Sequence, residues 1–184
     1  VVRPSGLNAN YANWERFSIG YNMYDYFLKE LMPLIYGWFP ASDKREDNFI
    51  AGLSMGGYGA MKCALTYPGR YAGAASFSGV ADLRRTVERR SVSLRETEIT
   101  AIFGEEKAVT PKDDLFVLAE RLSGNAPGLY VSCGEQDGLY ASNERFSAHL
   151  ASLGIAHRFE HWPGAHSWGF WDASLCAALA YFFD

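Results

Sequence analysis

Short apolar runs alternate along the chain with longer segments that carry apolar residues at helical spacing. Short apolar runs bounded by glycine, proline or polar residues are typical of buried strands. These runs predict strands at residues 49–53, 72–77, 129–133 and 155–160. The helical spacing predicts helices at residues 23–36, 55–67, 142–153 and 168–183. Because strands that alternate with helices form a mostly parallel sheet with helices on both faces, the pattern predicts an α/β fold.

The segment from Asp82 to about Gly124 differs in character, since it is charged and helical. Asp82 is a suitable helix cap, and Pro111 opens a further helix. An insertion of this kind between core strands forms either a lid over a site or additional surface helices. The sequence therefore predicts one domain over residues 1–184 with a helical insertion at about 82–124.

Composition and charge exclude several classes of protein. A formal net charge of −4 supplies no basic surface for nucleic acid or for an anionic membrane. The apolar stretches are far shorter than the roughly 20 residues needed to cross a bilayer. No signal peptide opens the chain, which predicts a cytoplasmic protein if Val1 is the natural start. Cys63, Cys133 and Cys176 are scattered in apolar runs, which predicts reduced, buried thiols and neither a disulfide framework nor a metal site.

The strand predicted at residues 49–53 runs into the pentapeptide GLSMG, residues 52–56, and a helix of small residues follows at once. The pattern Gly-x-Ser-x-Gly at a strand-to-helix turn exposes a serine hydroxyl at a helix N-terminus, where it can act as a nucleophile. The N–H of Met55 then points to where the oxyanion of an attacked acyl group would develop. The alternative is that Ser54 is only a turn residue, but the small residues that follow permit the close helix packing that the motif needs.

A serine nucleophile needs a base, usually histidine, and a carboxylate that orients it. His166 is the one histidine on a glycine-containing loop after the last predicted strand, and Asp137 lies in a glycine-flanked turn after the third. Rival histidines and carboxylates are His149, His157, His161, Glu135, Glu160 and Asp172. A lone loop histidine or turn aspartate usually has no such role. The chain order Ser54, Asp137, His166 is nevertheless that of α/β-hydrolases, and each residue follows the carboxyl end of a predicted strand.

Three segments together resemble one known family, the esterase D group of α/β-hydrolases. They are GLSMGGYGAMKCALTYPGRYAGAASFSG (52–79), CGEQDGLYASNERFSAHLASLGI (133–155) and PGAHSWGFWD (163–172). The nearest resemblance is to bacterial tributyrin esterases, and it runs from about Val1 to the C-terminus. It implies an α/β-hydrolase fold and a serine carboxylesterase that cleaves short-chain acyl esters through an acyl-enzyme. Ser54 would then be the nucleophile, His166 the base, Asp137 the orienting acid and Met55 an oxyanion donor.

Other members of this group leave alternatives open. S-formylglutathione hydrolases and mycolyl transferases suggest a thioesterase or an acyltransferase, and a non-catalytic module that retains the motifs is a third interpretation. The expected partner is a small acyl ester, with no cofactor and no metal, and a homo-oligomer remains open. Residues 8–11 resemble a loop that borders the pocket in the family, which makes Tyr11 a pocket candidate. Trp168 is another, whereas Trp162, Phe170 and Trp171 either line this pocket or pack in the core.

The front of the chain departs from the family. Val1-Val2 looks like the tail of a strand, and family members carry several strands before this point, with a histidine-glycine loop that gives the second oxyanion N–H. By the usual strand order, one strand is then missing between Val1-Val2 and residues 49–53. A sheet with such a gap would expose unpaired backbone groups. We therefore expect either a chain that continues upstream or a sheet that closes up differently.

Overall fold

The fold is built on a sheet of four parallel strands. The computed structural model describes residues 1–7, 9–16, 21–90, 96–122 and 124–184. The strands are β1 (Phe49–Leu53), β2 (Gly73–Phe77), β3 (Gly128–Gly134) and β4 (His157–Trp162). They lie side by side in the order β1-β2-β3-β4, and each neighbouring pair is parallel. The predicted parallel sheet is confirmed, and each predicted strand overlaps its observed counterpart.

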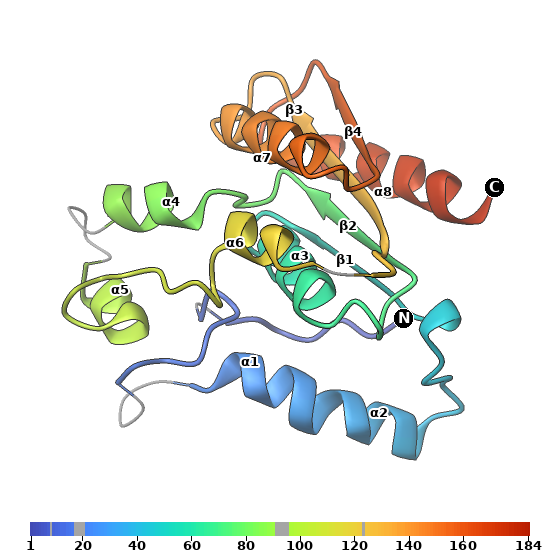
Figure 1. Ribbon diagram of the computed structural model, residues 1–184, viewed down its shortest axis with the longest axis horizontal. Coiled ribbons are helices and arrows are strands. Elements are labelled where there is room, and N and C mark those ends of the chain that lie inside the picture. The colour runs from blue at the N-terminus through green and yellow to red at the C-terminus, as the bar shows by residue number, and fades with distance from the viewer. Residues whose placement is uncertain (8, 17–20, 91–95, 123) are drawn as a thin grey trace.

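Helices cover both faces of this sheet. On one face, α3 (Met55–Thr66) packs against β1 and β2, and α7 (Tyr140–Ser152) packs against β3 and β4. On the other face, α8 (Trp168–Phe183) packs against β2 and β3 (Figure 1). Side chains of β3 alternate between the two layers, since Leu129 and Val131 join the larger core and Tyr130 the smaller one. The α/β fold predicted from the sequence is therefore confirmed.

The remaining helices lie around this three-layer body (Figure 1). The N-terminal helix consists of α1 (Met23–Asp25), a π-helical turn η2 (Tyr26–Leu31) and α2 (Met32–Trp38), and a short 3-10 turn, η3 (Arg45–Asp47), precedes β1. Between β2 and β3 the chain forms α4 (Leu83–Arg90), α5 (Glu96–Phe103) and α6 (Leu115–Glu120). Asp82 caps α4 as predicted, because its carboxylate accepts the backbone N–H of Arg85. The helical character predicted for this segment is thus observed.

Several local predictions were wrong. Val1 and Val2 are exposed and do not form the end of a strand. The four described strands adjoin one another, without the gap that was predicted between Val1-Val2 and β1. Among the described residues β1 pairs with β2 alone, which makes it an edge strand. Helix α6 begins at Leu115 with Asp114 as its cap, not at Pro111, and α7 begins at Tyr140, not at Ser142. The hydroxyl of Ser142 instead donates to the Leu139 carbonyl within the first turn of α7.

The three cysteines do not share one environment. Cys63 and Cys133 are buried as predicted, and burial raises the pKa of each thiol to about 12. Cys176 is exposed, because it lies on the outer face of α8, so the prediction of a third buried thiol was wrong. All three are free thiols.

Candidate active site

The turn between β1 and α3 holds Ser54 in a backbone conformation that is rare for a residue with a side chain. Its φ is 53° and its ψ is −119°. Its N–H donates to the Phe77 carbonyl at 2.9 Å, and its own carbonyl accepts the N–H groups of Tyr58 and Val80. A Cβ at Gly52 would collide with the backbone of Gly56, so only glycine permits so tight a turn. The sequence therefore presents the Ser54 hydroxyl at the carboxyl edge of the sheet.

Three predicted residues that are far apart in the chain meet at this edge. The His166 Nε2 lies 2.9 Å from the Ser54 Oγ, and its Nδ1 lies 2.7 Å from the Asp137 Oδ2. An ionised carboxylate can only accept, so Nδ1 carries the proton and Nε2 is left as the acceptor for the serine hydroxyl. The Asp137 side chain is 2% exposed and that of His166 is 38% exposed. The carboxylate is thus enclosed, while the imidazole remains open to an incoming molecule.

Asp137 is fixed by the turn on which it stands. Its N–H donates to the Gly134 carbonyl at 3.0 Å, and its second oxygen, Oδ1, accepts the N–H of Leu139 at 2.9 Å. Its own carbonyl accepts the N–H of Tyr140, the first residue of α7. Because both carboxylate oxygens and the backbone are engaged, this side chain has little freedom to leave His166.

The loop that carries His166 is interlocked with the Asp137 turn. The Gln136 N–H donates to the Gly164 carbonyl at 2.9 Å, and the Gly164 N–H donates back to the Gln136 Oε1 at 2.6 Å. A Cβ at Gly134 would strike the backbone of Gly164, so this close approach requires glycine. This role of Gln136 was not predicted from the sequence. The available signal was an amide next to Asp137, able to donate and accept across a loop contact.

The rival histidines have other partners. His149 contacts the Phe116 carbonyl at 3.2 Å, and His157 contacts the Ser147 hydroxyl at 2.7 Å. His161 lies 3.0 Å from Glu135, the nearest rival carboxylate. The other rival carboxylates lie elsewhere. Glu160 accepts the hydroxyl of Tyr130, a hydrogen bond that lowers the pKa of Glu160, and Asp172 is exposed on α8.

Met55 occupies the first position of α3, directly after Ser54. The N–H groups in the first turn of a helix have no acceptor within the helix, and the dipole makes this end favourable for negative charge. The Met55 N–H is therefore available beside the Ser54 hydroxyl. The role of Met55 as an oxyanion donor stays a prediction.

Tyr11 covers the first turns of α3. Its hydroxyl lies 3.9 Å from the point that a Cβ on Gly56 would occupy, and its ring leaves no room for a side chain at Gly59. Burial raises the pKa of Tyr11, so its hydroxyl stays neutral at physiological pH. Asn10 and Tyr11 both have positive φ angles, 49° and 45°. Asn8, which belongs to the stretch that resembles the family loop, lies outside the described residues.

The aromatic residues near His166 are divided between surface and core. Trp168 is 68% exposed, and its ring meets that of Trp171 edge to face at 5.3 Å. It is Trp171 whose ring contacts the His166 imidazole, at 4.9 Å between centroids. Trp162 stacks on the buried Phe170 at 4.5 Å. The structure thus puts Trp171 directly against the imidazole and Trp168 one ring further out.

A buried ion pair holds the Tyr11 loop against α3. The Lys62 ammonium donates to the Asp113 Oδ1 at 2.6 Å and to the Tyr11 carbonyl at 2.8 Å, and it lies 4.0 Å from the centre of the Tyr24 ring. The Thr110 hydroxyl donates to the second Asp113 oxygen. The Lys62 side chain is 2% exposed, and burial lowers its pKa. One cation therefore ties together α3, the N-terminal loop and the segment before α6.

We expect Lys62→Met to destabilise the protein by about 3–5 kcal/mol, because it leaves the Asp113 carboxylate buried without its cation. Urea unfolding followed by circular dichroism measures this loss. The double variant Lys62→Met/Asp113→Leu removes both charges and should recover most of the stability. A single variant within 1 kcal/mol of the parent would contradict the prediction.

No group of three or more metal-ligating side chains occurs in the part of the chain that the structure describes. Over the same residues, no helix is both long and apolar enough to traverse a bilayer.

Similar structures identify the class of this fold. The chain superposes on the fluorophosphonate-binding serine hydrolase F of Staphylococcus aureus with a TM-score of 0.85 and 33% identity, covering 96% of this chain and 68% of that one. It superposes on an S-formylglutathione hydrolase of the same organism with a TM-score of 0.81 and 32% identity, covering 97% and 69%. The molecule is therefore an α/β-hydrolase, similar to serine hydrolases.

The family follows from the sequence comparisons. The family model described as "Putative esterase" matches residues 1–182, so the chain belongs to this esterase family. An acetyl esterase of Caldicellulosiruptor saccharolyticus is 28% identical over 187 residues, which cover 97% of this chain and 70% of that protein. Together with the serine hydrolase neighbours, these matches identify a carboxylic ester hydrolase.

Proposed function

We propose that the protein is a serine carboxylesterase that hydrolyses short-chain acyl esters, with Ser54 as nucleophile, His166 as base and Asp137 as orienting carboxylate. The observation that supports this most strongly is the continuous hydrogen-bonded path from Asp137 through His166 to the Ser54 hydroxyl. Membership of the esterase family and the acetyl esterase relative support ester hydrolysis and a short acyl group. The proposal includes that the enzyme is of the tributyrin-esterase type.

The acylation half of the reaction uses the groups at the β1–α3 turn. The His166 Nε2 takes the Ser54 proton while the Oγ attacks the acyl carbon, which leaves negative charge on the former carbonyl oxygen. The Met55 N–H and the N-terminus of α3 stabilise this oxyanion. When the tetrahedral intermediate collapses, the imidazolium returns its proton to the leaving alcohol, and an acyl-Ser54 ester remains.

Deacylation repeats the same steps with water. The His166 Nε2 removes a proton from a water molecule as its oxygen attacks the acyl-enzyme. Collapse of the second tetrahedral intermediate releases the carboxylic acid and returns the proton to the Ser54 Oγ. Asp137 keeps its charge throughout and stabilises the imidazolium that forms in each half-reaction.

A fluorophosphonate probe tests the proposal. Such a probe phosphonylates an activated serine, so intact-mass and peptide mapping should find one adduct, on Ser54. Ser54→Ala should abolish both the adduct and turnover of p-nitrophenyl acetate. An adduct on another residue, or hydrolysis that survives in Ser54→Ala, would refute the assignment of Ser54 as nucleophile. A parent protein with neither adduct nor turnover would favour the non-catalytic interpretation.

A thioesterase is the second candidate function, since one neighbour at 32% identity is an S-formylglutathione hydrolase. The same serine chemistry would act on a thioester, and the leaving group would be a thiol. Comparing kcat/KM for S-formylglutathione with that for acetyl and butyryl esters separates the two. A thioester preference of about 100-fold or more, which is about 2.7 kcal/mol of transition-state stabilisation, would favour the thioesterase.

A further inference from the structure

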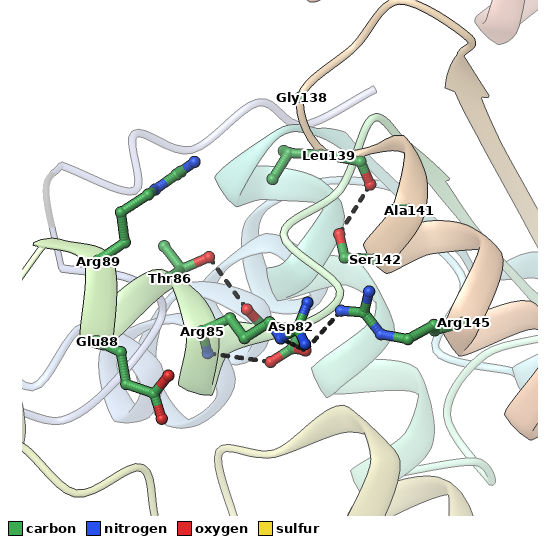
Figure 2. A pocket seen from close by; sticks show the side chains of 10 residues that line it. All are labelled: Asp82, Arg85, Thr86, Glu88, Arg89, Gly138, Leu139, Ala141, Ser142 and Arg145. Atoms are coloured by element: carbon green, nitrogen blue, oxygen red, sulfur yellow. Dashed lines mark hydrogen bonds and ion pairs between the residues drawn. The ribbon is translucent and has the colours of Figure 1, made fainter.

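A charged cavity lies between α4 and the start of α7, beside the turn that carries Asp137 (Figure 2). Its volume is about 400 Å³. The residues that line it are Asp82, Arg85, Thr86, Glu88, Arg89, Gly138, Leu139, Ala141, Ser142 and Arg145. Three of them are arginines, although the whole chain has a formal net charge of −4.

Asp82 holds Arg145 through a hydrogen bond and lies near the guanidinium of Arg85. The Arg145 Nη2 lies 2.8 Å from the Asp82 Oδ2, and the Arg85 Nε lies 3.8 Å from the same oxygen. The other oxygen, Oδ1, accepts the Arg85 backbone N–H. A guanidinium has five N–H donors, so this one carboxylate leaves most of the donors on both side chains unused.

The third arginine, Arg89, has no ion-pair or hydrogen-bond partner among the described residues, and it is exposed. Figure 2 shows its guanidinium standing apart from the Asp82 cluster, while the Glu88 carboxylate points away from Gly138 and Leu139. The lining contains three guanidinium groups, Arg85, Arg89 and Arg145, and two carboxylates, Asp82 and Glu88, so its formal charge is positive. A planar guanidinium fork is suited to a carboxylate, which it can bind through two parallel hydrogen bonds.

The opposite wall of the cavity is formed by the N-terminus of α7. Helix α7 has thirteen residues, and Leu139 at its N-cap makes no side-chain cap. Ala141 lies at the second helical position, so its N–H has no acceptor within the helix. The helix dipole acts in the same direction as the arginines, although the enclosed Asp137 carboxylate, which accepts the Leu139 N–H, offsets part of it.

This cavity is built from the loops that also hold the candidate active site. Leu139 lines it, and the Leu139 N–H is the group that binds the Asp137 carboxylate. Asp82 follows shortly after Val80, whose N–H binds the Ser54 carbonyl. A molecule that spans both places could thus be held by an anionic group at the cavity while its acyl carbon reaches Ser54.

We propose that the cavity binds a carboxylate carried by the substrate at a distance from the scissile acyl bond, with Arg89 and Arg145 as the principal donors. This inference rests on the proposed esterase function and narrows its substrate class to anionic esters or thioesters. The carboxylate can belong either to the leaving group or to the acyl chain, and the two sources need different substrates to separate them.

Two matched pairs of substrates test the inference on the full chain. S-acetylglutathione and its bis-amide, in which both carboxylates are converted to carboxamides, differ in the carboxylates of the leaving group. p-Nitrophenyl hemisuccinate and p-nitrophenyl butyrate differ in a carboxylate on the acyl side. We expect kcat/KM to favour the anionic member of one pair, and the ratio within that pair to fall about tenfold in Arg89→Gln. Arg89→Lys should retain part of the preference for the anionic substrate. Roughly 0.5 M salt should weaken that preference in the parent protein, because salt screens exposed charges.

Arg121→Gln is the matched control, since Arg121 is an exposed arginine at the end of α6 and outside this cavity. Its ratios should equal those of the parent. If the parent hydrolyses the two substrates that lack carboxylates but prefers neither anionic member, or if Arg89→Gln keeps the full preference, the inference is wrong and the proposed function stands. Failure to hydrolyse any of the four substrates would overturn both.

Discussion

Ser54→Gly is expected to abolish ester hydrolysis and at the same time to stabilise the folded protein. Loss of the nucleophile should lower kcat by about 10⁴-fold or more. The gain in stability has a separate cause, because Ser54 has a φ of 53°, a region in which a side chain is strained and glycine is not. Relief of about 1–3 kcal/mol of strain exceeds the cost of glycine's greater freedom in the unfolded chain, about 0.5–1 kcal/mol. We therefore expect a net gain of about 1 kcal/mol in the free energy of unfolding.

Ser54→Ala is the control for this prediction. It removes the same hydroxyl but retains a Cβ, so it should lose as much activity and gain no stability from relieved strain. Urea unfolding and thermal melts of both variants, beside p-nitrophenyl acetate turnover, measure the two effects; a gain of 1 kcal/mol corresponds to about 2–4 °C in Tm. Equal stabilities of the two variants would show that the turn does not strain Ser54.

The strand-to-helix turn was predictable from sequence because its requirements are local. Glycine at residues 52 and 56, an apolar strand before Ser54 and a small-residue helix after it all lie within about twenty residues. The helix of residues 168–183 was predicted with its observed bounds for a similar reason, since a loop with proline and glycine precedes it. Where a signal is contained in one segment, the sequence is sufficient.

The supports of the site were not predictable, because they join distant segments. The amide of Gln136 marks a residue that can form hydrogen bonds, but nothing in the sequence reveals that its partner is Gly164, which lies on another loop, accepts the Gln136 N–H and donates to the Gln136 Oε1. The ion pair between Lys62 and Asp113 likewise looks like two surface charges in a sequence, since charged residues are seldom fully buried. Trp168 lies on the exposed side of α8, whereas Trp171 contacts the His166 ring. Helical spacing alone did not predict which of the two tryptophans would meet His166.

Asp137→Asn is expected to lower kcat by about 10³–10⁴-fold with little change in stability. The Asp137 Oδ1 accepts the N–H of Leu139, and an asparagine would keep its carbonyl oxygen there. Its amide NH₂ would then face the His166 Nδ1, which must become an acceptor. The imidazole proton would move to Nε2, the atom that has to take the proton from Ser54. The side chain would keep its shape and its fit, but the base would be held in the wrong tautomer.

Glu135→Gln is the matched control, because Glu135 lies on the same turn and its partner is His161, not His166. It should change kcat by less than about threefold, as expected for an exposed pair of little energetic weight. Steady-state kinetics with p-nitrophenyl acetate, together with urea unfolding of each variant, makes the comparison. If Asp137→Asn retained more than a tenth of the parent's kcat, the carboxylate would not be what orients His166. If Glu135→Gln instead lost as much as Asp137→Asn, the effect would belong to the charge of the turn and not to the tautomer that Asp137 imposes.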